Sequence, residues 1–61
     1  MILIGIVTNV SSGIWAHIPA LRAEYGPLSY LGEAGDYSTG DRVAVSSAGS
    51  DEYIVLGVVH P

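Results

Sequence analysis

Few side chains in this sequence could do chemistry, and the two histidines come first among them. His17 and His60 both fall on segments with strand-like composition, so neighbouring strands would allow them to share a metal ion. A divalent metal needs a third and usually a fourth ligand, and Asp41, Asp51 or Glu52 would have to supply it. Since no spacing ties these carboxylates to the histidines, we predict no metal site and expect two histidines on the surface or at an interface.

No arrangement of residues predicts catalysis or cofactor binding. The sequence has no Gly-x-Ser-x-Gly motif, and most of its serines fall in predicted turns. Asp51 and Glu52 are adjacent, so on a strand their side chains would point to opposite faces and could not act as a pair. The glycine-rich stretch 32–41 lacks the lysine of a phosphate-binding loop and the ligand spacing of a calcium loop. We therefore predict no enzyme, no catalytic residue and no cofactor.

The aromatic residues give a clearer indication. Trp15 falls on the face of its predicted strand opposite the predicted core, together with His17, and Tyr25, Tyr30 and Tyr37 crowd one long connection. Rings of this kind dominate the binding energy of many protein interfaces, where each fills a pocket on the partner. Ordinary packing under the long connection is the alternative for Trp15. We take all five residues as candidates for a protein interface.

Length and composition favour an assembly subunit over a free monomer. The chain has 61 residues, 49% of them hydrophobic and 13% charged, and it has no cysteine. One small domain, residues 1–61, buries only about 60% of its unfolded surface and is usually reinforced by disulfides, metals or oligomerisation. With disulfides excluded and no metal site predicted, we expect a homo-oligomer.

Charge and hydropathy exclude two classes of partner. Six acidic residues and two arginines give a net charge of −4, with no lysine. Nucleic acids and anionic membranes are bound through clusters of basic side chains, which this chain does not have. The apolar opening stretch 1–10 lacks a basic leader and a cleavage site, so we expect no signal peptide and synthesis in a cytoplasm.

Most of the chain has the composition of β-strands separated by turns. Strands are predicted at residues 2–10, 14–20, 41–47 and 52–60, which form one hairpin at each end of the chain. The connection 21–40 is predicted to hold a helical turn at 21–25 and a short strand at 27–32. Since closure removes exposed strand edges, this count favours an all-β fold, a small five-stranded OB-like Greek-key barrel with one long central connection.

The last segment, YIVLGVVHP, is apolar on both faces. Alternation places Tyr53, Val55 and Val59 on one side, and the other side is formed by Ile54, Leu56 and Val58. Only one side can face the barrel core. The other is covered by the long connection or by a neighbouring subunit, so Ile54, Leu56 and Val58 join the candidate interface. Gly5 and Gly57, inside the two longest strands, are predicted to mark bulges or bends.

Four pieces of the sequence, in order, resemble one protein family. GIVTNV (5–10), GIWAHIPAL (13–21), GDRVAV (40–45) and DEYIVLGVV (51–59) are similar to the OB-fold domains of phage tail hubs and baseplate spikes, and to the module of the type VI secretion spike. The pieces cover roughly two-thirds of the chain. Spike proteins also carry a β-helical needle or a lysozyme domain, which is not seen here, so the resemblance implies a free-standing tail protein or an adaptor.

The resemblance implies a structural role. We expect a hub, tip or baseplate component of a phage tail or tail-like particle, assembled in the bacterial host cytoplasm and located in the virion. Its partners would be copies of itself, as a trimer or a ring, and other tail proteins. A capsid decoration protein is the first alternative, and a nucleic-acid-binding OB or SH3-like module is the second.

Overall fold

The computed structural model describes residues 2–50 and 52–60, and within them the chain forms five strands and two short 3₁₀ turns. The strands are β1 (Ile2–Asn9), β2 (Ile14–Ile18), β3 (Ala23–Tyr30), β4 (Arg42–Gly49) and β5 (Glu52–Val58). The 3₁₀ turns are η1 (Pro19–Leu21) and η2 (Ala34–Asp36). Asp51, which the sequence places in the β4–β5 turn, and Pro61 lie outside the described residues.

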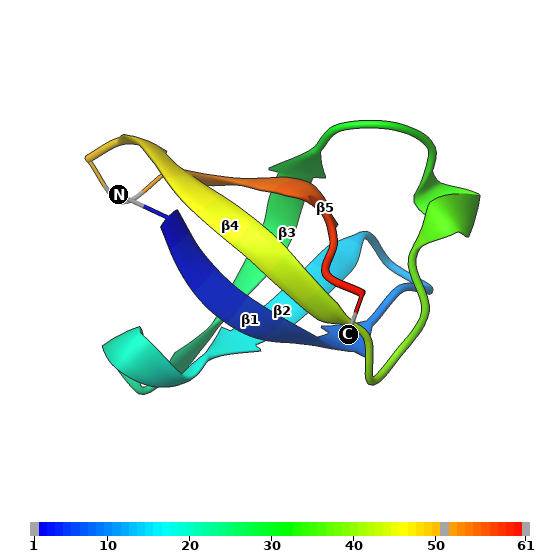
Figure 1. Cartoon of the computed structure of the whole chain (residues 1–61), viewed down its shortest axis with the longest axis horizontal. Helices are drawn as coiled ribbons and strands as arrows, with labels where there is room; N and C mark the ends of the chain where they lie inside the picture. The colour runs from blue at the N-terminus through cyan, green and yellow to red at the C-terminus, as the bar shows by residue number, and fades with distance from the viewer. Residues whose placement is uncertain (1, 51, 61) are drawn as a thin grey trace.

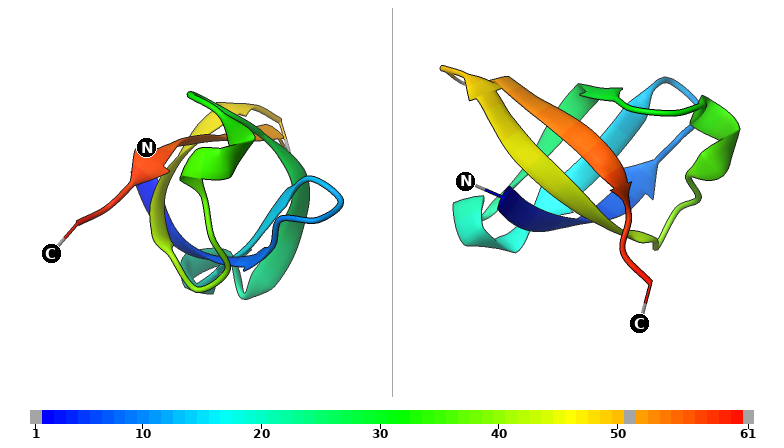
Figure 2. Two further views of the ribbon diagram at one scale, coloured as in Figure 1. Left: turned by 90° about the vertical axis from the view of Figure 1, so that its right-hand side faces the viewer. Right: turned by 45° about the horizontal axis from the view of Figure 1, so that its top comes forward.

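The strands close into a single barrel in the order β1-β2-β3-β5-β4, with β4 returning to β1 (Figure 1). All neighbours are antiparallel except β3 and β5, which are parallel. Figure 2 shows the barrel end-on, with the β3–β4 connection and its η2 turn passing across one opening. This arrangement confirms the prediction of an all-β, five-stranded, OB-like barrel.

The core is built from short aliphatic side chains on the inner face of each strand. Val43 and Val45 of β4 and Val55 of β5 are fully buried, as the alternation in those strands predicts. The same cluster includes Val7, Ile14, Ala16, Ile18, Leu28 and Tyr37. Leu3, Leu21, Tyr25, Tyr53 and Val58 pack against it. One continuous core therefore fills the barrel.

The third strand is longer than the sequence indicates. Residues 23–30 form one continuous strand, so the predicted helical turn at 21–25 is wrong, and the predicted short strand at 27–32 is only the end of β3. The helical turn is η1, which begins two residues earlier, where Pro19 has the fixed φ that suits a first helical position. It ends at Arg22, which adopts a left-handed conformation (φ 55°) and donates its backbone N–H to the Pro19 carbonyl.

The two glycines inside the longest strands differ in their surroundings. Gly57 lies beside a register shift between β4 and β5, which confirms the predicted irregularity there. The β1–β4 register runs unbroken past Gly5, so the bulge expected at Gly5 is absent from this strand pair. A Cβ at Gly5 would lie 3.4 Å from the His17 carbonyl oxygen, an ordinary van der Waals contact, so no close approach explains this glycine.

The irregularity in β5 also changes which side chains face the core. Val45 pairs with Val55, whereas Ala44 pairs with Gly57, so one extra residue stands in β5 at this point. The prediction that Val58 shares a face with Leu56 is therefore wrong, because Val58 packs against the core.

Candidate protein interface

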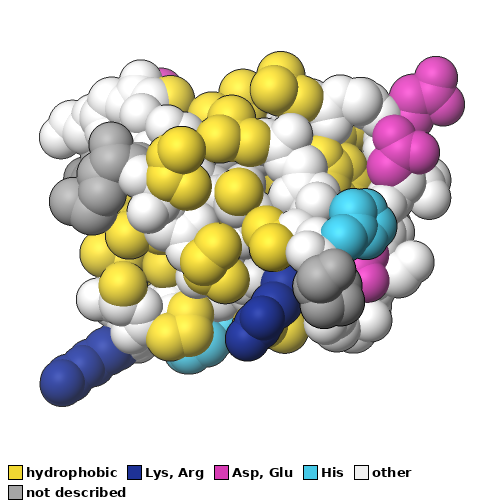
Figure 3. Space-filling view, viewed as in Figure 1, with side chains coloured by type: hydrophobic (Ala, Val, Ile, Leu, Met, Phe, Trp, Pro, Cys, Tyr) yellow, Lys and Arg dark blue, Asp and Glu magenta, His cyan; other side chains and the backbone are white. Residues whose placement is uncertain are grey.

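The outer surface of β1, β4 and β5 carries a continuous set of aliphatic side chains. Alternation turns them outward because their strand neighbours Val7, Val45 and Val55 are buried in the core. We call this surface the aliphatic face and define it by Ile2, Ile4 and Ile6 of β1, Ala44 of β4, and Ile54 and Leu56 of β5. Figure 3 shows apolar side chains spread over these three strands.

Strand register brings these side chains together. Ile4 lies opposite Ala44, and Ile2 and Ile54 flank Ser46 from its two sides. Ile2 is 64% exposed and Ile4 is 46% exposed, values far from those of core isoleucines. Exposed aliphatic side chains that gather on one face are a feature of interaction surfaces in soluble proteins.

The aliphatic face has few polar groups within it. Arg42 pairs with Ile6 at one end of the β1–β4 ladder, and Ser46 lies between Ile2 and Ile54. The molecule measures 27 × 26 Å perpendicular to its shortest axis, which is the direction of view in Figure 3. The aliphatic face is part of the surface seen in this view, and Arg42 and Ser46 are polar residues that its strands place within or beside it.

Ile54 and Leu56 were predicted from the sequence as interface residues, whereas the three isoleucines of β1 were missed. The sequence pattern placed Ile2, Ile4 and Ile6 on one face but did not say which face of β1 meets the core. Leu3 and Val7 make the opposite face apolar as well, so alternation alone could not choose between the two faces.

The outer face of β2 and β3 differs from the aliphatic face. Trp15 is half-buried there because its ring lies over Gly26, where a Cβ would approach the ring to 2.3 Å. Its indole N–H donates to the Ser12 carbonyl at 3.2 Å. His17 is exposed beside Glu24, and the Glu24 carboxylate accepts a hydrogen bond from the Thr8 hydroxyl. The Trp15 ring therefore packs within the chain, which was one of the two alternatives for this residue.

The predicted tyrosines lie in three different environments. Tyr37 is only 5% exposed, so it belongs to the core and not to the surface, and its hydroxyl donates to the Leu31 carbonyl at 2.6 Å. Tyr30 is 37% exposed and meets the Tyr37 ring edge-on at 5.7 Å. Tyr25 is half-buried and lies 5.2 Å from the Tyr53 ring. Their clustering in the sequence does not produce one aromatic surface.

Burial also changes the acidity of Tyr37. Desolvation raises the pKa of its hydroxyl above 10.0, and the neighbouring charges of Asp36 and Tyr30 raise it further. The phenol is therefore held in its neutral form, in which it can donate to Leu31. This tyrosine fastens the β3–β4 connection over the end of the barrel.

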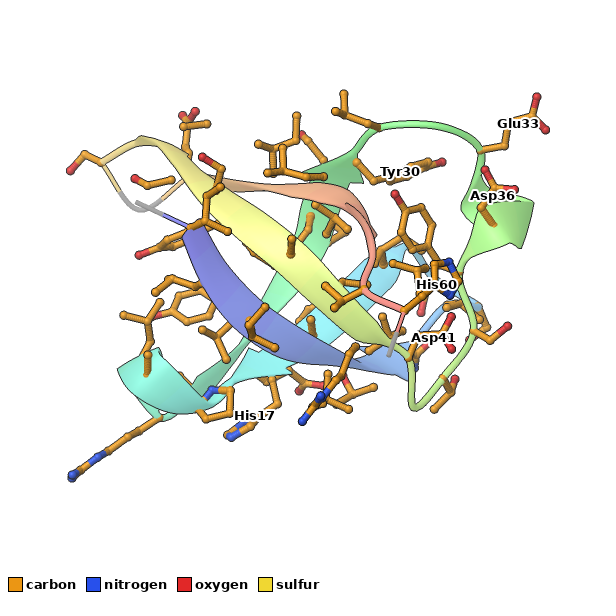
Figure 4. The ribbon with its side chains drawn as sticks, in the orientation of Figure 1. His17, Tyr30, Glu33, Asp36, Asp41 and His60 are labelled. Atoms are coloured by element: carbon orange, nitrogen blue, oxygen red, sulfur yellow. The ribbon has the colours of Figure 1, made fainter. Side chains whose placement is uncertain are left out.

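The two histidines lie apart, and the carboxylates near them have structural roles. His17 is on β2, whereas His60 follows β5 near the β3–β4 connection (Figure 4). Among residues 2–50 and 52–60, no group of three His, Cys, Asp or Glu side chains could hold a metal ion. In the connection, Asp36 accepts from the Glu33 backbone N–H at 3.2 Å and Asp41 accepts from the Ser38 N–H at 2.9 Å.

Comparison with known proteins adds no relative. No protein-family model, no curated protein and no solved structure matches the chain. In the part of the chain that the structure describes, no helix has the length and apolar character needed to cross a membrane.

Proposed function

We propose that this chain is a structural subunit that acts through protein-protein contacts, in the hub, tip or baseplate of a phage tail or a tail-like particle. The observation that carries the structural role is the aliphatic face, since it turns six apolar side chains outward from three adjacent strands of a closed barrel, with Ile2 and Ile4 exposed and the other four half-buried. The assignment to a tail is supported by the four ordered pieces that resemble tail-hub and spike OB domains.

The first contact proposed for this face is with another copy of the chain, as a trimer or a ring. A barrel of 61 residues has a small core, and burying a second apolar surface would add stabilisation in proportion to the area removed from water. Contacts with other tail proteins would then extend the assembly. No reaction, metal or cofactor is part of this proposal.

Light scattering of the purified chain after size-exclusion chromatography tests the self-assembly. We expect a single oligomeric species at micromolar concentration, with a mass that is an integral multiple of 6.3 kDa. A stable monomer under these conditions would contradict the proposed homo-oligomer.

The location in a particle needs a separate experiment. Heads and tails are separated from the particle whose genome encodes this chain. Mass spectrometry should then find the chain in the tail fraction. Recovery from heads would instead support a capsid decoration protein. Binding to a polyanion column at low salt would favour a nucleic-acid module, which the acidic composition and the presence of only two arginines oppose.

A further inference from the structure

A second surface feature lies between β3 and β5, where the barrel wall opens. These strands pair only at Ser29 with Ile54 and at Tyr30 with Val55, so their preceding residues diverge. The opening forms a groove of about 320 Å³. That volume is at the lower end of the range for ligand sites, about 300 Å³, and suits one side chain better than a large molecule.

Aromatic rings form the floor of the groove. Tyr25 and Tyr53 line it, and both are half-buried and pack against the core. Their centroids lie 5.2 Å apart with the rings tilted by 57°. Tyr25 and Leu28 both face inward because β3 has two residues, Gly26 and Pro27, opposite the single Trp15 of β2. The two rings are therefore held in place by the fold before any ligand binds.

The rim of the groove carries a negative charge. Glu52 is exposed and lines the groove on the β5 side, and exposed Pro27 and Ser29 line it on the β3 side. Neither arginine of the chain is among the lining residues, so the groove offers a carboxylate without a lining cation. A planar cation satisfies both parts of this site, since it can stack on tyrosine and pair with a carboxylate.

We propose that this groove binds the guanidinium group of an arginine side chain on a partner protein. The apolar stem of the arginine would lie against Pro27, the guanidinium plane would lie over the tyrosine rings, and its N–H groups would donate to Glu52. Arginine fits better than lysine because its planar head is less strongly hydrated and can donate two parallel hydrogen bonds to one carboxylate. The site is separate in function from the aliphatic face, although Ile54 borders both.

Titration followed by NMR tests the site on the full chain labelled with ¹⁵N. The probe is the tripeptide Gly-Arg-Gly with both ends blocked, and the matched control peptide has neutral citrulline in place of arginine. We expect saturable shifts at millimolar probe, confined to amides of residues 25, 26, 28, 29 and 52–54, with binding at least about fivefold weaker for citrulline, since a charged hydrogen-bond partner is lost.

Two variants locate the interaction. Glu52→Gln should weaken binding of the arginine probe to the level of the citrulline peptide, whereas Glu33→Gln, an exposed residue of the β3–β4 connection, should leave it unchanged (Figure 4). Equal binding of both peptides, or unchanged binding by Glu52→Gln, would overturn the proposal, as would the absence of shifts in the groove. The titration is repeated with Leu56→Asp, which alters the aliphatic face alone. Binding of the arginine probe should persist in this variant even where self-association is lost, so failure of this site can be told apart from failure of the proposed assembly.

Discussion

The two outer faces of the barrel differ in how their large apolar side chains are used. On the β2–β3 face, the Trp15 ring packs on Gly26 and its indole N–H donates to Ser12, so the chain itself supplies the contacts. On the aliphatic face, Ile2 and Ile4 remain exposed to solvent. The difference teaches that residue type alone does not identify an interface. What matters is whether the fold leaves the side chain without an internal contact.

The largest effect is expected from placing a charge on the aliphatic face. Leu56→Asp should abolish self-association, with a dissociation constant raised by about 100-fold or more, because an unpaired carboxylate would be buried between copies. The fold should persist, since Leu56 points away from the core side on which Val55 is buried. Sedimentation velocity would measure the oligomer, and circular dichroism would check the fold.

Two controls make this test specific to the face. Ser50→Asp puts the same carboxylate on an exposed residue of the β4–β5 turn, and Glu33→Gln alters the exposed β3–β4 connection. Neither should change the oligomer. If Glu33→Gln dissociated it while Leu56→Asp did not, self-association would not run through the aliphatic face.

A smaller effect is expected from disturbing the packing of Trp15. Gly26→Ala places a Cβ 2.3 Å from the indole ring, so the ring must move, and we expect a loss of about 1–3 kcal/mol in the free energy of unfolding. Urea denaturation followed by circular dichroism measures it, a signal that does not depend on Trp15. Self-association should be retained, because the aliphatic face is untouched.

A double-mutant cycle sharpens the same point. In the Trp15→Ala background, the Gly26→Ala substitution should cost much less, because the ring that it displaces is gone. Additive losses in the double variant would show that Trp15 and Gly26 do not depend on each other, and Trp15 would then return to the candidate interface.

The parts of the fold that could be predicted are those in which alternation alone decides the outcome. Val43 and Val45 alternate with polar or small neighbours, so their inward orientation and the β4–β5 hairpin followed from the pattern. β3 was harder to recognise because Gly26 and Pro27 interrupt its alternation, although the bulge opposite Trp15 accommodates both. Only the contact with Trp15 explains why glycine is present there.

The candidate site was predictable only in part for a similar reason. Outward alternation identified Ile54 and Leu56, but the extra residue in β5 reversed the orientation of Val58. Tyr37 could not be assigned from its neighbours in sequence. Its burial depends on the β3–β4 connection passing across the barrel opening, a contact between distant parts of the chain (Figure 2).

The smallest effect is expected for Tyr37, which, like Trp15, has its contacts inside the chain. Tyr37→Phe removes the hydroxyl that donates to Leu31 and should lower the free energy of unfolding by about 1 kcal/mol at neutral pH. The pKa of Tyr37 is raised in the folded state, so folding favours its protonated form. Its contribution should be complete below pH 10.0, the ordinary pKa, and should be lost as the pH rises through the higher folded-state pKa.

Urea denaturation of the wild-type chain and Tyr37→Phe at a series of pH values measures this difference. The stability advantage of the wild type should be constant at neutral pH and should shrink above about pH 10. Tyr30→Phe is the matched control, because that ring is more exposed and packs against the Tyr37 ring itself. If the advantage over Tyr37→Phe stayed constant through this alkaline range, the buried phenol would not be the group that titrates. If the oligomer dissociated in Tyr37→Phe at neutral pH, Tyr37 would contribute to assembly, and the assignment of assembly to the aliphatic face alone would be wrong.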